Sequence, residues 1–102
     1  MAITDFKVEI RVRAKEEVDE ISFYYEKLSD GLGKRFYKEF KEYSRTLANN
    51  PFFEVKYEDI RKISLKIFPY SIQFRVNEKL KIVYIEAITN DNLHPFSGKL
   101  KN

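Results

Sequence analysis

Apolar and polar residues alternate with a period of two along two consecutive segments between positions 60 and 76. The first segment has Ile63, Leu65 and Ile67 between polar residues, and the second continues the alternation through Tyr70, Ile72, Phe74 and Val76. A third segment, 80–88, is apolar at most positions. Alternation of this kind is typical of strands with one buried face and one solvated face. We therefore predict three successive antiparallel strands.

The N-terminal half begins with another alternating segment, 5–13, which predicts a half-buried strand. The apolar spacing then becomes helical over 14–28 and 32–48, with Asp30, Gly31 and Gly33 at the turn between the two helices. The apolar stripes that define these helices are Val18, Ile21, Tyr25 and Leu28 in the first, and Leu32, Phe36, Phe40, Tyr43 and Leu47 in the second.

Charged residues complete this interpretation of the helices. We expect Glu16 and Glu17 in the first turn of the first helix, where carboxylates favour the helix dipole. The solvated side of the second helix is expected to carry the charged residues Lys34, Lys38, Glu39, Lys41, Glu42 and Arg45. Pro51 ends that helix, because proline disfavours helical backbone angles at the residue before it.

The expected order is β-α-α-β-β-β, an α+β domain with a helical hairpin packed on one face of an antiparallel sheet. The aromatic connector 51–59 is expected to cover the helix ends, and 89–102 to form a loose tail. We place a single domain in residues 1–95 and a flexible basic tail in 96–102. A chain of 102 residues is long enough for one core of modest size.

Composition narrows the function classes. The chain has no cysteine, which excludes disulfides and cysteine-ligated zinc. No segment approaches the roughly 20 apolar residues of a membrane helix, so we expect a cytoplasmic protein with no membrane partner. His94 is the only histidine, and no cluster of acidic residues has metal-ligand spacing. We therefore expect neither a metal nor a cofactor.

Positive charge is concentrated on the predicted sheet. The net charge is +3, and six Lys and Arg residues lie within 60–81 against one acid, Glu78. Lys62, Lys66 and Arg75 fall on the solvated side of the first two strands, where they are candidate contacts for a phosphate or another anionic target. Tyr84 could stack a base, whereas alternation places Tyr70 in the core. The alternative is an ordinary solvated strand face.

Four sequence segments, in order, resemble toxins of the RelE/ParE superfamily from bacterial type II toxin–antitoxin modules, which are sometimes labelled plasmid-stabilisation proteins. The resemblance covers about residues 5–95. It includes a turn similar to "S-P-G-L-G-x-R-F" and a strand similar to "L-x-x-F-P-Y-x-I". The segments are 18–25, 29–36, Asn50-Pro51 with 57–61, and 65–72 followed by Phe74, Arg75 and Val76.

The resemblance implies a growth-inhibiting toxin that a cognate antitoxin neutralises with an acidic, amphipathic segment. It also implies that operator DNA is bound only through the antitoxin. Some members poison DNA gyrase and others cut ribosome-bound mRNA. We expect a gyrase-type toxin that acts by binding. A ribosome-dependent endoribonuclease using the basic sheet face is the first alternative, and an inactive toxin fold or nucleic-acid-binding module is the second.

The chain departs from the family where catalysis is concerned. Many members end the last strand with "H-x-x-R-[DN]-P", but here the matching positions are Asn90, Leu93, His94 and Pro95. Ser64 and Ser71 stand where a nuclease needs further basic residues, and no tyrosine follows Tyr84. These departures leave no confident catalytic residue, so the sequence alone does not assign the chain to an enzyme class.

Overall fold

The computed structural model describes residues 5–53 and 55–92. Within these residues, two helices form a hairpin beside a five-stranded sheet, and no helix has the length and apolar character needed to cross a bilayer. In chain order the elements are β1 (Lys7–Ile10), α1 (Val12–Leu28), α2 (Leu32–Asn49), β2 (Val55–Tyr57), β3 (Ile60–Ser64), β4 (Tyr70–Asn77) and β5 (Ile82–Asn90).

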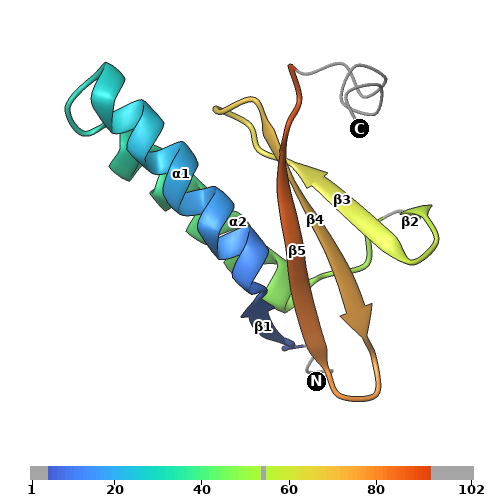
Figure 1. Ribbon diagram of the computed structural model, residues 1–102. Coiled ribbons are helices and arrows are strands. Elements are labelled where there is room, and N and C mark those ends of the chain that lie inside the picture. The colour runs from blue at the N-terminus through green and yellow to red at the C-terminus, as the bar shows by residue number, and fades with distance from the viewer. Residues whose placement is uncertain (1–4, 54, 93–102) are drawn as a thin grey trace.

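The strands lie in the order β1-β5-β4-β3-β2. The pairs β2–β3, β3–β4 and β4–β5 are antiparallel, whereas β1 pairs with β5 in parallel. The hairpin of α1 and α2 crosses one face of this sheet and leaves the other face uncovered by helices (Figure 1). The α+β class and the helical hairpin on one face are thereby confirmed.

The core lies between the hairpin and the covered face of the sheet. Register places Ile63, Ile72 and Ile88 side by side in one row across this face, and Phe74 and Ile85 in the next. The helices contribute Phe36, Phe40 and Leu47, each at most 2% exposed. Burial of such side chains contributes about 1.5–3 kcal/mol each, so this layer holds the domain together.

The end of the helical hairpin is fixed by a carboxylate and two glycines. Gly31 has a φ of 86°, in the left-handed region where glycine is favoured. The Glu26 carboxylate accepts hydrogen bonds from the backbone N–H of Gly31 (2.7 Å) and Gly33 (3.0 Å). These hydrogen bonds and the nearby Lys34 lower the pKa of Glu26, with the Gly31 N–H as the largest cause.

Several sequence predictions about local structure were wrong. The first strand ends at Ile10, and α1 begins at Val12, so Glu16 and Glu17 lie beyond its first turn. The connector contains an additional strand, β2, whose residues are exposed, whereas Phe53 just before it packs against the core. Thr89 and Asn90 belong to β5, while residues 93–102, including the expected flexible tail 96–102, lie outside the described residues.

Two side chains that bear on the site were also misplaced. Strand β3 ends at Ser64, so Lys66 lies in the β3–β4 turn and not on a strand face. Glu39 is 5% exposed instead of solvated, and its carboxylate accepts hydrogen bonds from the backbone N–H groups of Lys66, Ile67 and Phe68. A turn without regular backbone partners is stabilised in this way from the neighbouring helix.

Candidate functional site

The sheet face that the helices leave uncovered is one candidate surface, which we call the open face. Register places side chains on it in rows, because residues paired across strands project on the same side. Lys62, Gln73 and Ala87 form one row, and Arg75, Tyr84 and Glu9 form another. A third row contains Ser64, Ser71 and Thr89.

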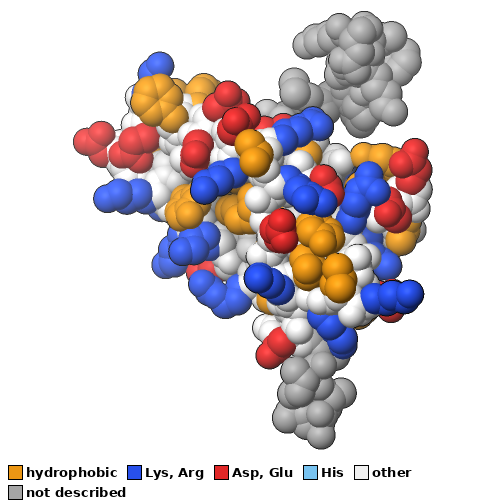
Figure 2. Space-filling model, turned by 60° about the horizontal axis from the view of Figure 1, so that its bottom comes forward, with side chains coloured by type: hydrophobic (Ala, Val, Ile, Leu, Met, Phe, Trp, Pro, Cys, Tyr) orange, Lys and Arg blue, Asp and Glu red, His pale blue; other side chains and the backbone are white. Residues whose placement is uncertain are grey.

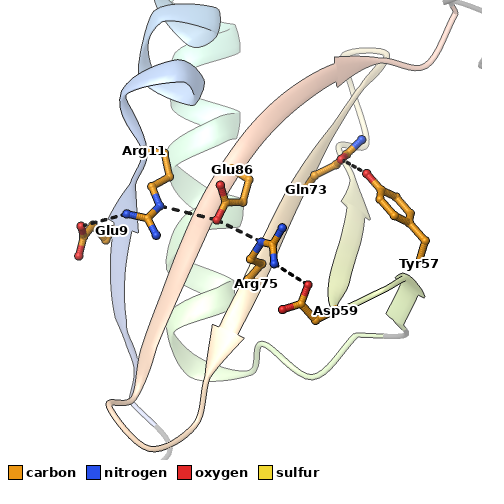
Figure 3. Close-up of polar contacts among 7 residues, drawn as sticks. All are labelled: Glu9, Arg11, Tyr57, Asp59, Gln73, Arg75 and Glu86. Atoms are coloured by element: carbon orange, nitrogen blue, oxygen red, sulfur yellow. Dashed lines mark hydrogen bonds and ion pairs between the residues drawn. The ribbon is translucent and has the colours of Figure 1, made fainter. Parts of the chain in front are cut away.

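Ion pairs cross the open face from β1 towards the loop between β2 and β3 (Figure 3). The Arg75 guanidinium lies 2.6 Å from the Asp59 carboxylate and 3.4 Å from Glu86. On its other side Glu86 is 3.6 Å from Arg11, which is itself 4.0 Å from Glu9. The charges therefore alternate in sign along this chain of five residues, which we call the ion ladder.

The centre of the ion ladder depends on a β-bulge in β5. Gln73 pairs with Ala87 and Phe74 pairs with Ile85, so Glu86 has no partner on β4. Such an extra residue bends the strand and redirects its side chain. On the helix side, the Glu17 carboxylate accepts a 2.7 Å hydrogen bond from the Ile88 N–H. The bulge is thereby fixed from both sides of the sheet.

The structure separates the three candidate contacts that the sequence grouped together. Lys62 and Arg75 share the open face, on neighbouring strands, but Lys66 lies in the β3–β4 turn. Arg75 is engaged by Asp59 and Glu86, so its charge is largely compensated. Their role as target or phosphate contacts stays a prediction.

The remaining polar residues of the open face bind one another. Ser71 donates a 2.7 Å hydrogen bond to Asp91, and its hydroxyl lies 3.0 Å from that of Ser64. Tyr57 donates to the Gln73 side chain over 2.9 Å (Figure 3). Ser64 and Ser71, where a nuclease would need basic residues, thus belong to a hydrogen-bonded network that ends on the Asp91 carboxylate.

The two tyrosines considered as base-stacking residues have different environments. Tyr70 is 8% exposed and belongs to the core, where burial raises its pKa to about 12. The Tyr84 ring is covered by the Arg11 guanidinium, which lies 4.2 Å from its centroid. A ring already stacked on a cation has one face fewer to offer a base. The burial of Tyr70 confirms that the alternation of apolar and polar residues places it in the core.

A second candidate surface is a groove of about 580 Å³ beside β1, between that strand and the two helices. Its walls are largely apolar, from Val8, Ile10, Val18, Phe40 and Ala48. Its charged members are Lys15, Lys41 and Arg45 against Asp19, so positive charge exceeds negative charge. Strand β1 is also an edge strand, whose outer side can pair with another strand.

Charges elsewhere are mixed. On the face in Figure 2, Lys and Arg side chains are interspersed with Asp and Glu around groups of apolar side chains. A continuous basic surface, as expected of a nucleic-acid-binding domain, is not seen on that face. Among residues 5–53 and 55–92, no group of three or more His, Cys, Asp or Glu is arranged to hold a metal ion.

Comparison with known proteins identifies the family. A family model described as "ParE toxin of type II toxin-antitoxin system, parDE" matches residues 8–91. This chain belongs to the ParE toxin family. It is therefore a toxin of the ParE/RelE type from a type II toxin–antitoxin system. A search of curated proteins found no match.

Solved structures have the same fold as this ParE-family toxin. The chromosomal ParDE system from P. aeruginosa aligns with a TM-score of 0.72 at 18% identity, over 85% of this chain and 97% of the other. A mutant of the E. coli toxin RelE, in the free state, aligns with a TM-score of 0.58 at 17% identity, over 86% of this chain and 85% of the other. The archaeal RelE–RelB complex from Pyrococcus horikoshii OT3 aligns with a TM-score of 0.56 at 15% identity, over 88% of this chain and 99% of the other.

Sequence reasoning missed the acidic half of this site. It named Arg75 but neither Asp59 nor Glu86, because strand register and the bulge bring these carboxylates to Arg75 from other segments. One signal was available in the sequence. Glu86 interrupts an otherwise apolar strand, and an acid at such a position generally has a partner.

Proposed function

We propose that this ParE-family toxin acts in the cytoplasm by binding DNA gyrase, without cutting RNA, and is neutralised by a cognate antitoxin. The observation that carries the proposal is the pairing of Arg75 with Asp59 and Glu86. A nuclease needs cations that are free to stabilise the charge developing on a phosphodiester. An arginine between two carboxylates is poorly suited to that task.

The surroundings of Arg75 support the same proposal. Within the described residues, Ser64, Ser71 and Asp91 bind one another where a nuclease would present basic groups. Of the three cations predicted from the sequence, Lys62 is the one on the open face that Asp59 and Glu86 do not engage. One lysine cannot serve as general base and as phosphate clamp at the same time. A protein target makes weaker demands, since a mixed, partly apolar surface is an ordinary protein interface.

The antitoxin is proposed to occupy the groove beside β1. Its apolar walls suit the apolar side of an amphipathic helix, and the excess of cations suits acidic residues on that helix. The free edge of β1 could then accept an extended segment of the same partner. The P. aeruginosa ParDE and E. coli RelBE structures, to which this chain is similar in fold, are toxin–antitoxin systems.

The target is tested by two assays, one with purified toxin and one in cells that express it. We expect inhibition of gyrase-catalysed DNA supercoiling, and no new mRNA 5′ ends by primer extension after induction in cells. Toxin boiled before the assay controls for contaminants. New 5′ ends with unimpaired supercoiling would reverse the assignment in favour of the endoribonuclease. If both effects are absent and growth on induction is normal, the chain is an inactive toxin fold.

The contribution of Lys62 is tested by charge reversal. If the open face contacts the target, Lys62→Glu weakens gyrase inhibition by tenfold or more, which corresponds to about 1.4 kcal/mol. Lys38→Glu, an equal charge change on the exposed side of α2, is the matched control and should retain inhibition. Equal loss in both variants would show that only overall charge matters.

The groove is tested with the antitoxin encoded beside the toxin gene. The double variant Lys41→Glu/Arg45→Glu reverses two cations of the groove. Lys34→Glu/Lys38→Glu makes the same charge change nearer the N-terminus of α2. We expect calorimetry to show at least tenfold weaker antitoxin binding for the first variant and about threefold weaker binding for the second. Similar affinities for both variants would place the antitoxin elsewhere.

A further inference from the structure

We propose that the open face contains an oxyanion site occupied by the chain's own Glu86 carboxylate. In this view Arg11 and Arg75 form the site, and Asp59 compensates the remaining charge of Arg75. The site would take the oxygens of a phosphate group only after these carboxylates are neutralised. The inference goes beyond the proposed function, because it concerns what the open face excludes, whichever target the toxin has.

The Glu86 carboxylate lies between two arginines and forms an ion pair with each of them. Two guanidinium groups from different elements converge on the same carboxylate oxygen, Oε2. The Nε of Arg11 is 3.6 Å from it and the Nε of Arg75 is 3.4 Å from it. An oxygen shared between two arginines is a common way to bind a phosphate or carboxylate. Here the anion comes from the protein itself.

Both arginines are held in place by contacts other than Glu86. Arg11 stacks on the Tyr84 ring at 4.2 Å, and its backbone N–H donates to the Ile85 carbonyl at 3.0 Å. Arg75 donates a 2.6 Å hydrogen bond to Asp59. A site that keeps its shape when one ligand is removed is preorganised for another ligand of the same charge.

The site is also open to a ligand from solvent. A depression of about 440 Å³ lies beside the ion ladder, and its charged lining residues are Arg11, Arg75 and Lys79 with the acids Asp59 and Glu78. This volume exceeds that of a phosphate group. The Glu86 side chain is 28% exposed, so an entering oxyanion would meet its charge directly. We infer that repulsion by Glu86 and Asp59 keeps phosphate out.

Glu86 cannot easily withdraw from the arginines. It is the extra residue of the β5 bulge, and two positions later the Ile88 N–H is bound to Glu17 on the helix side. Movement of the bulge would break that hydrogen bond. The occupant is therefore a built part of the fold, and neutralising its charge is the direct way to release the two arginines from it and to remove the repulsion towards an oxyanion.

The experiment compares Asp59→Asn/Glu86→Gln with Glu16→Gln/Glu20→Gln, which makes the same charge change on the exposed side of α1. Two probes are used: inorganic phosphate, followed by NMR at the arginine Nε–H groups, and a fluorescein-labelled RNA 12-mer, followed by anisotropy. We expect the site variant to bind both probes at least tenfold more tightly than wild type. The α1 variant should change by about threefold or less.

A third variant identifies the site. Adding Arg75→Ala to Asp59→Asn/Glu86→Gln should abolish the gain for both probes. Equal gains in the site variant and the α1 variant, or a gain that survives Arg75→Ala, would overturn the proposal, as would a gain for RNA alone. If the double variant does not fold, Glu86→Gln alone provides the test, with a gain of at least threefold required over Glu16→Gln.

Discussion

The buried carboxylate of Glu39 on α2 binds the backbone N–H of Phe68, 29 residues further along the chain, at 3.2 Å. Its other oxygen accepts from Lys66 and Ile67 at 3.1 and 2.8 Å. Three consecutive N–H groups of the β3–β4 turn therefore share one acidic side chain. Hydrogen bonds to a charged group contribute more to stability than neutral ones, so this contact stabilises the turn that carries Lys66.

Replacing Glu39 by glutamine should destabilise the domain. The amide keeps one acceptor oxygen but presents an N–H₂ group to a backbone donor, which leaves the Phe68 N–H without a partner. We expect a loss of about 1–3 kcal/mol in the free energy of unfolding, measured by urea denaturation. Glu42→Gln, exposed on the same helix, should stay within about 0.5 kcal/mol of wild type. Equal effects would contradict the role of Glu39.

Gly33 should not tolerate a methyl group. A Cβ at this position would lie 2.3 Å from the Ser22 carbonyl oxygen, which belongs to the backbone of α1 and cannot rotate away. Gly33→Ala is expected to lower the free energy of unfolding by about 1–3 kcal/mol, although alanine favours helices. Thermal unfolding provides the measurement.

The neighbouring glycine provides the control for this prediction. A Cβ added at Gly31 meets no atom within 4 Å, although φ is +86°. Asparagine tolerates left-handed angles, so Gly31→Asn should destabilise less than Gly33→Ala. The opposite order would show that the backbone angle at Gly31, and not the helix contact at Gly33, limits the hairpin.

The features predicted well from sequence are those with long, uninterrupted periodicity. Phe36, Phe40 and Leu47 of the α2 stripe are buried as predicted. So are Tyr70, Ile72 and Phe74 of β4, although Ser71 on the polar side of that strand is buried as well. These patterns are reliable because many residues of one element indicate the same buried face. The stripe of α1 is less regular, and its last member, Leu28, is 60% exposed.

The features missed from sequence depend on contacts between distant segments. No local pattern indicates that β1 runs parallel to β5, or that Glu39 is buried under a turn 27 residues away. The same limit applies to the site. Arg75 could be recognised as a candidate cation, but its charge compensation depends on a strand register and a bulge that place Glu86 beside it.

The hydrogen bond from Ile88 to Glu17 gives a prediction about the bulge. Glu17→Ala removes the acceptor 2.7 Å from this N–H, in a partly buried position. We expect a loss of about 1–3 kcal/mol in the free energy of unfolding and faster hydrogen exchange at the Ile88 amide. Glu20→Ala, exposed on the same helix, should leave that exchange rate unchanged. Unchanged exchange in Glu17→Ala would mean that the ion ladder alone holds the bulge.

The lowered pKa of Glu26 predicts how stability changes in acid. Its carboxylate is favoured by folding, because the Gly31 and Gly33 N–H groups bind the charged form. A group whose pKa is lower in the folded state stabilises the fold above its ordinary value of 4.5. That contribution disappears as the pH falls through the lowered pKa. Wild type should therefore lose more stability than Glu26→Gln between about pH 6 and about pH 3.

Denaturant unfolding at a series of pH values measures this difference directly. Carboxylates other than Glu26 titrate in both proteins, so their contributions cancel when the two stability profiles are subtracted. The remaining difference should be largest near neutral pH, where wild type is the more stable protein, and should shrink in acid. Parallel profiles would mean that the Gly31 and Gly33 hydrogen bonds do not discriminate between the charged and neutral carboxyl groups.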